Sequence, residues 1–123
     1  MKKFLISFLV SCPIIAYADY STYFNKCSDE STGITSEILD CIGLEIDYQD
    51  DRLNKAYKKL QQQLTKSEKF KLRDEQRAWI RTRDRNVNQI YKTQDGTRAD
   101  INGRSLYLEL TMKQANKLER RIK

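Results

Sequence analysis

The sequence lacks histidine entirely among its 123 residues. This absence removes the side chain that most often acts as a general base and most often binds a metal ion. The chain also lacks a phosphate-binding loop, internal repeats, low-complexity tracts and any long polar–apolar alternation that would indicate a strand. The sequence therefore predicts no catalytic residues, no cofactor and no metal site.

One enzymatic hypothesis stays open, because a pair of Asp and Glu side chains can catalyse the hydrolysis of a glycosidic bond. The spacing of the carboxylates does not predict a cleft, however, and three helices of this size rarely build one. A non-enzymatic binding protein is therefore the favoured interpretation.

Cysteine is scarce, and the first of the three, Cys12, lies in a segment of the signal-peptide type. Lys2-Lys3 is followed by an apolar run over 4–15, which is too short to span a bilayer, and then by Ala16-Tyr17-Ala18, a small-x-small cleavage pattern. We expect cleavage near Ala18, removal of 1–18, and a periplasmic or secreted single domain over 19–123.

A competing interpretation treats Leu9-Val10-Ser11-Cys12 as a bacterial lipobox, in which Cys12 becomes a lipid-anchored first residue. Simple cleavage is favoured because the apolar run continues past this cysteine. Cleavage leaves Cys27 and Cys41, and two cysteines in an oxidising compartment most simply form a disulfide with each other. The alternative is a pair of free thiols.

The net charge of +6 conceals a strong asymmetry along the chain. The segment 19–52 carries nine acidic and two basic residues, whereas 53–123 carries 19 basic and eight acidic residues. The two halves of the chain could pair within one compact fold, or each could face a different partner. The same choice applies to the acidic stretch Glu45, Asp47, Asp50 and Asp51, which is either a solvated helix face or a surface for a basic protein.

Apolar spacing predicts an all-α fold. After an irregular arm over 19–36, we expect long helices over 36–64 and 68–91, with Ser36 and Ser67 as their N-caps. Their short connection predicts an antiparallel hairpin. A polar loop is expected over 93–102. A third, C-terminal helix then starts at Gly103 or Arg104, ends at Ile122 and packs on the hairpin. The Cys27–Cys41 disulfide is expected to hold the N-terminal arm on the first long helix.

The second helix contains the string 76–84, which includes the only tryptophan. Trp79 falls at core spacing, so a core role is favoured over a ligand platform. Gln76, Arg83 and Asp84 have two possible roles, an interhelical polar network or contact with a partner, and the network is favoured. If Arg83 is buried, it needs an acidic partner such as Glu45 or Asp50. A basic ridge lies at helical spacing along the same helix, formed by Arg77, Arg81 and Arg85.

The order of these motifs resembles the LprI-type lysozyme-inhibitor family, over about residues 27–118. The residues that carry the resemblance follow Cys41 and are Glu45, Asp50, Leu53, Asn54, Tyr57, Gln76, Arg77, Trp79, Arg83, Asp84, Leu110 and Thr111. Family members often have a second cysteine pair where this chain has Val87 and Leu106, and usually an arginine where it has Gln114. The apolar pair suggests that a hydrophobic contact replaces that disulfide.

The resemblance implies binding and inhibition of lysozyme, or of a related cell-wall hydrolase, in the cell envelope. The alternative is a binder of an anionic envelope polymer or membrane surface that uses the basic ridge and the 113–123 run. Steep salt dependence would mark that alternative. Nucleic-acid binding fits the charge but not the compartment. The sequence does not indicate an oligomeric state.

Overall fold

The structure, a computed structural model, describes residues 20–123 and consists of four helices in that range. They are α1 (Thr22–Glu30), α2 (Thr35–Gln62), α3 (Lys66–Thr93) and α4 (Gly96–Arg121). The predicted all-α hairpin with a further C-terminal helix is confirmed. The predicted signal segment, its cleavage site and Cys12 lie outside the described residues.

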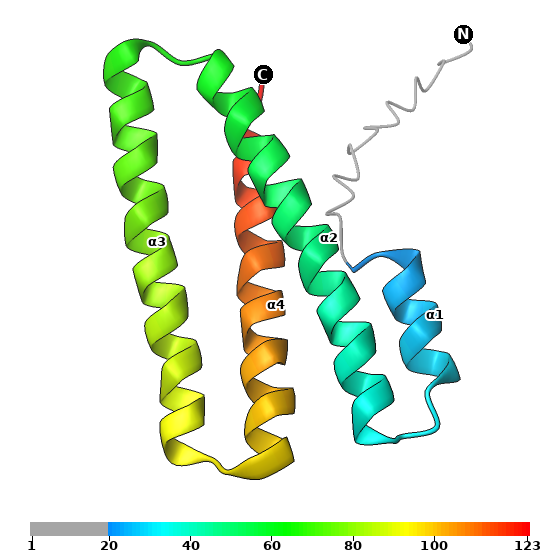
Figure 1. Cartoon of the computed structure of the whole chain (residues 1–123). Helices are drawn as coiled ribbons and strands as arrows, with labels where there is room; N and C mark the ends of the chain where they lie inside the picture. The colour runs from blue at the N-terminus through cyan, green and yellow to red at the C-terminus, as the bar shows by residue number, and fades with distance from the viewer. Residues whose placement is uncertain (1–19) are drawn as a thin grey trace, which may run out of the picture.

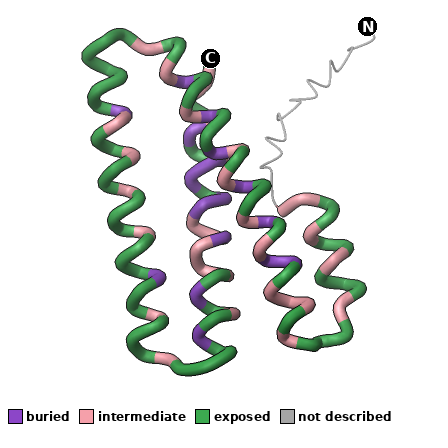
Figure 2. Tube along the Cα trace, in the orientation of Figure 1, coloured by how far each residue is buried: buried purple, intermediate pink, exposed green. Residues whose placement is uncertain are grey.

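Helix α4 is the element against which the other two long helices pack. It contacts both α2 and α3, and Figure 1 shows it between them, with α1 beside the first half of α2. The buried positions concentrate on α2 and α4, whereas α3 is exposed along most of its length (Figure 2). The central core cluster joins all three long helices and consists of Leu53, Ala56, Leu60, Leu72, Ala115 and Leu118.

The prediction of an irregular arm over 19–36 was wrong, because Thr22–Glu30 forms α1. These nine residues include weak helix formers, and tertiary contacts overrode that weak propensity. Ser21 caps the helix by accepting a hydrogen bond from the Phe24 backbone N–H at 3.1 Å. The helix then turns back onto α2 through Gly33, whose φ of 86° lies in the left-handed region that favours glycine.

The predicted helix ends also needed correction. The N-cap of α3 is Thr65, not Ser67, and it forms a reciprocal capping box with Glu68. Helix α2 starts at Thr35 after Ile34, without the Ser36 cap that was expected. Helix α4 starts at Gly96, well before position 103, because the polar run that was interpreted as a loop is the solvated face of a helix whose Ala99 is buried.

Candidate functional site

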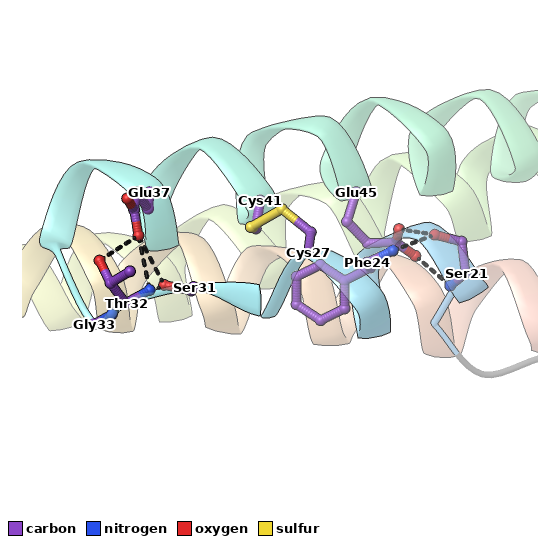
Figure 3. The surroundings of a disulfide bond; sticks show 9 residues. All are labelled: Ser21, Phe24, Cys27, Ser31, Thr32, Gly33, Glu37, Cys41 and Glu45. Atoms are coloured by element: carbon purple, nitrogen blue, oxygen red, sulfur yellow. Dashed lines mark hydrogen bonds between the residues drawn. A yellow bond between two sulfur atoms is a disulfide. The ribbon is translucent and has the colours of Figure 1, made fainter. Parts of the chain in front are cut away.

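Three residues of α2 fasten α1 along its whole length. Glu37, Cys41 and Glu45 are spaced four residues apart, so they lie on one row of the helix and face α1 (Figure 3). Glu37 holds the turn after α1, Cys41 holds the middle of α1, and Glu45 holds its N-terminus. The two helices therefore form a rigid hairpin, which we call the arm, defined as residues 20–51.

The middle fastening is the disulfide between Cys27 and Cys41, as the sequence predicted. Their Cα atoms are 5.8 Å apart, inside the usual range for a disulfide. At the turn, a Glu37 carboxylate oxygen accepts hydrogen bonds at 2.9 Å from both the backbone N–H and the hydroxyl of Thr32. These two hydrogen bonds lower the pKa of Glu37 below its ordinary value, and the bond from the Thr32 backbone N–H has the larger effect.

Glu45 fastens the N-terminus of α1 from a position where its side chain is almost fully buried. Its carboxylate accepts hydrogen bonds from the Ser21 backbone N–H at 2.9 Å, the Ser21 hydroxyl at 2.5 Å and the Gln49 amide at 2.8 Å. These three donors satisfy the buried carboxylate. Glu45 is therefore an anchor of the arm and is not available to Arg83, so that predicted pair was wrong.

The polar network continues from Glu45 into the α2–α4 interface. The Arg52 guanidinium donates to the Gln49 side-chain oxygen at 2.7 Å and to the two Glu119 carboxylate oxygens at 2.7 and 2.8 Å. It also donates to the Asn116 side-chain oxygen. Each of the three guanidinium nitrogens of Arg52 donates at least one hydrogen bond, so this network links the arm to the end of α4.

Arg83 lies against two aromatic rings rather than beside a buried acid. Its guanidinium carbon is 4.9 Å from the centre of the Trp79 ring and 4.0 Å from that of Tyr107 on α4. Its ion pair within residues 20–123 is with the neighbouring Asp84, at 3.0 Å. The predicted direct pair with Asp50 was wrong, and Arg83 instead helps to hold α3 on α4.

Asp50 is half-buried on α2 and accepts a hydrogen bond from the Tyr107 hydroxyl at 3.3 Å. Burial raises the pKa of Asp50 above its ordinary value, and the nearby Arg83 charge and the Tyr107 hydroxyl offset only part of that effect. The ionised carboxylate is therefore less stable in the folded protein than in the unfolded chain.

This shift gives a pH-dependent prediction for Asp50→Asn. Because the pKa of Asp50 is higher in the folded protein than in the unfolded chain, the protonated carboxyl favours the folded state. This stabilisation is lost as the pH rises from the ordinary aspartate pKa through the folded pKa. We expect the variant to match the wild type near pH 3 and to be more stable at pH 7. The gain should stay below about 1 kcal/mol, because the carboxyl remains partly solvated.

Urea unfolding at both pH values measures this difference, with Asp100→Asn on the exposed face of α4 as the control. The quantity compared is the unfolding free energy of Asp50→Asn minus that of the wild type. If this difference is smaller at pH 7 than at pH 3, the interpretation of Asp50 as a carboxyl destabilised by burial is contradicted.

The remaining motif residues divide between the core and the surface. Leu53 and Thr111 are buried, while Tyr57 and Trp79 are half-buried and pack against the core cluster, as expected for core residues. Gln76 accepts a hydrogen bond from the Gln114 amide at 2.9 Å, so it connects α3 with α4. Solvent-exposed residues complete the motif: Asn54, Arg77 and Asp84.

The positions of the absent second disulfide are both shielded from solvent. Val87 is buried on α3 and Leu106 is half-buried on α4, and these two helices pack on one another. The basic ridge has the opposite environment, because Arg77, Arg81 and Arg85 are all exposed on α3.

The fold separates the two charge signs. The arm carries eight acidic residues and one basic residue, Lys26, whereas α3 carries nine basic and four acidic residues. Figure 1 shows α1 and the first half of α2 on the edge of the molecule opposite α3. Nine of the 19 basic residues of 53–123 therefore lie on the helix opposite the arm, and the other ten lie on the second half of α2 and on α4 or just after it.

Sequence reasoning missed a set of apolar side chains on the outside of the arm. Tyr23 is 60% exposed, and Leu44 and Tyr48 are each 51% exposed. Leu44 and Tyr48 stand one helical turn apart and lie off the buried row of α2, which would have been a usable signal. Tyr23 also lines a groove of about 400 Å³ between α1 and α2, together with Lys26, Glu30, Asp40 and the disulfide.

The described residues offer neither a metal site nor a membrane-spanning helix. Within residues 20–123, no group of histidine, cysteine, aspartate and glutamate side chains is arranged to hold a metal ion. In the same range, no helix has the length and apolar character needed to cross a membrane.

Comparison with known proteins identifies a family. A family model described as Lysozyme inhibitor LprI matches residues 27–118, which cover more than half of the chain. No curated protein and no solved structure matches. The matched region begins at the first cysteine of the disulfide and contains almost all of α2, α3 and α4.

Proposed function

Because the chain belongs to the LprI lysozyme inhibitor family, we propose that it inhibits a lysozyme, or a related cell-wall hydrolase, by binding the enzyme directly. The family is an inhibitor family and is typically extracytoplasmic. The observation that supports direct binding is the acidic arm, which lies on the edge opposite the basic α3. Lysozymes of the animal type are strongly basic, so their charge complements the arm.

Electrostatic complementarity acts mainly on the rate of association and on the choice of partner. A basic enzyme that approaches the arm is attracted, whereas the same enzyme approaching α3 is repelled. The net positive charge of the whole chain therefore opposes the complex least when the arm faces the enzyme.

The proposed site of action is the periplasm or the cell exterior, after cleavage near Ala18. The Cys27–Cys41 disulfide supports this location, because disulfides form and persist in oxidising compartments. A lipid anchor on Cys12 is the alternative, and mass spectrometry of the mature protein distinguishes the two.

A second candidate function follows from the basic ridge. Arg77, Arg81 and Arg85 are exposed at successive turns of α3, where they can contact the phosphates or carboxylates of an envelope polymer. A polymer binder would also slow cell-wall lysis by covering the substrate, without touching the enzyme. Because its contacts are exposed charges, the effect would fall steeply with salt.

An assay of cell-wall lysis tests the proposed function. The purified protein is titrated against several lysozyme classes at low and at moderate salt, beside a variant in which Arg77, Arg81 and Arg85 are all replaced by glutamine. We expect inhibition of at least one class that saturates near one inhibitor per enzyme, survives moderate salt and is retained by the variant. If no class is inhibited, the proposal fails; if the variant loses all inhibition, the polymer function replaces it.

A further inference from the structure

The exposed apolar residues of the arm form one surface with the acidic residues around them. On α2, Asp40, Leu44 and Tyr48 follow one another at four-residue spacing, so they make a continuous row, with Asp47 beside it. Tyr23 of α1 joins this row through the groove that it shares with Asp40. We call these five residues the arm face: Tyr23, Asp40, Leu44, Asp47 and Tyr48.

The composition of the arm face is that of a protein-binding surface. Two tyrosines and a leucine of the arm face are each more than half exposed. Exposed apolar groups gathered within a polar rim mark interaction sites, and tyrosine is prominent among the residues that dominate binding energy. The groove beside Tyr23 is lined by its ring, the disulfide, Lys26 and the carboxylates of Glu30, Glu37 and Asp40. An aromatic wall with carboxylates at the rim suits the long stem and charged head of a lysine or arginine.

The arm face is also rigid. The fastenings at Glu37, Cys41 and Glu45 hold α1 against α2 at both ends and in the middle. A surface that is already ordered loses little conformational entropy when a partner binds, so more of the contact energy appears as affinity.

The charge selects the partner. Lys26 is the only basic residue in the arm, against eight acidic residues. A partner with a basic surface gains from this field, and an anionic polymer is repelled by it. Tyr48, at the other end of the row, also lines a groove with Arg52, Lys55 and Lys59. The charge therefore favours a basic folded protein at the Tyr23 and Asp40 end of the arm face.

We infer that the arm face is the surface that docks a basic lysozyme, with the tyrosines and Leu44 in the centre of the contact and the carboxylates at its rim. This inference rests on the proposed function and specifies the surface that performs it. The central apolar residues set the rate of dissociation, and the rim carboxylates set the rate of association and its salt dependence.

Two double variants test the inference against matched controls. Leu44→Ser with Tyr48→Ser removes the apolar centre, and its control is Phe70→Ser with Ile80→Ser, a pair of exposed apolar residues on α3. Asp40→Asn with Asp47→Asn removes two rim charges, and its control is Asp74→Asn with Asp100→Asn, which changes the net charge equally on α3 and α4. Circular dichroism verifies that every variant is folded.

The probe is a purified basic animal-type lysozyme, with binding followed by calorimetry and by stopped-flow kinetics. We expect the apolar variant to raise Kd at least about 30-fold, mainly through faster dissociation. The carboxylate variant should slow association several-fold at low salt and reduce its salt dependence. Both controls should stay within about twofold of wild type. Folded arm-face variants that bind like wild type would overturn the inference.

A further measurement separates this inference from the proposed function. If wild type inhibits lysis and the arm-face variants inhibit equally, the function stands and the docking surface is wrong. If wild type inhibits no lysozyme, amide shifts of the labelled protein are followed while the same lysozyme is added. Shifts confined to the arm then support the docking surface without inhibition, whereas shifts elsewhere or no shifts overturn it.

Discussion

Replacement of Leu72 by alanine is expected to lower the free energy of unfolding by about 2–5 kcal/mol. Leu72 is 1% exposed, and only it and Val87 are buried on α3. Its side chain enters the core cluster formed with α2 and α4, so truncation leaves a cavity at the junction of three helices. The free energy of unfolding of a small domain is about 5–15 kcal/mol in total, so this single change removes a large share of it.

Urea unfolding followed by helical circular dichroism measures the effect, with Phe70→Ala as the control. Phe70 precedes Leu72 by two residues on the same helix but is 48% exposed, so its truncation should cost less than about 1 kcal/mol. Equal destabilisation by the two changes would contradict the position of Leu72 as the main anchor of α3.

Removal of the disulfide by Cys27→Ala with Cys41→Ala is expected to cost about 3 kcal/mol, because the crosslink closes a short loop that restricts the unfolded chain. The two cysteines are 14 positions apart. The hydrogen bonds of Glu37 and Glu45 remain, so α1 should stay in place part of the time but exchange its amide protons faster. Lysozyme inhibition should weaken as the arm loses rigidity.

The measurements are urea unfolding and amide hydrogen exchange of residues 22–30, with Ser28→Ala on α1 as the control. Wild type under reducing conditions should reproduce the double variant. A cost below about 1 kcal/mol, together with unchanged exchange in α1, would mean that the two carboxylate fastenings are sufficient without the disulfide.

Apolar periodicity was sufficient to predict the long helices and most of the core. Leu53, Leu60 and Leu72 recur at helical spacing, and each is buried where that spacing placed it. The capping residues were harder to assign, because Thr65 and Ser67 are both good caps and only the capping box with Glu68 distinguishes them. A search for the reciprocal pattern of Thr65 and Glu68 would have found the correct start.

Helix α1 and the start of α4 were missed because local sequence did not determine them. The residues of α1 are held by contacts with α2 that are distant in sequence, such as Ser21 with Glu45. The first turns of α4 are polar on their solvated face, and a single buried small residue, Ala99, is a weak signal.

The charge asymmetry was visible in the sequence, but its consequence required the fold. A basic majority along the chain suggested repulsion from a basic enzyme, whereas the arm and α3 lie on opposite edges (Figure 1). The pairing of Arg83 was also beyond the sequence, because an arginine can be satisfied by aromatic rings such as Trp79 and Tyr107 as well as by an acid.

The most direct test of inhibition by direct binding uses a substrate that the protein cannot cover. Hydrolysis of a short, soluble, neutral N-acetylglucosamine oligosaccharide by a lysozyme is measured with increasing amounts of the purified protein, and the inhibition constant is compared with the Kd from calorimetry. Direct binding at the enzyme predicts inhibition of this substrate with an inhibition constant equal to Kd. Inhibition of cell-wall lysis alone, with undiminished hydrolysis of the oligosaccharide, would contradict it and favour the binding of an anionic envelope polymer.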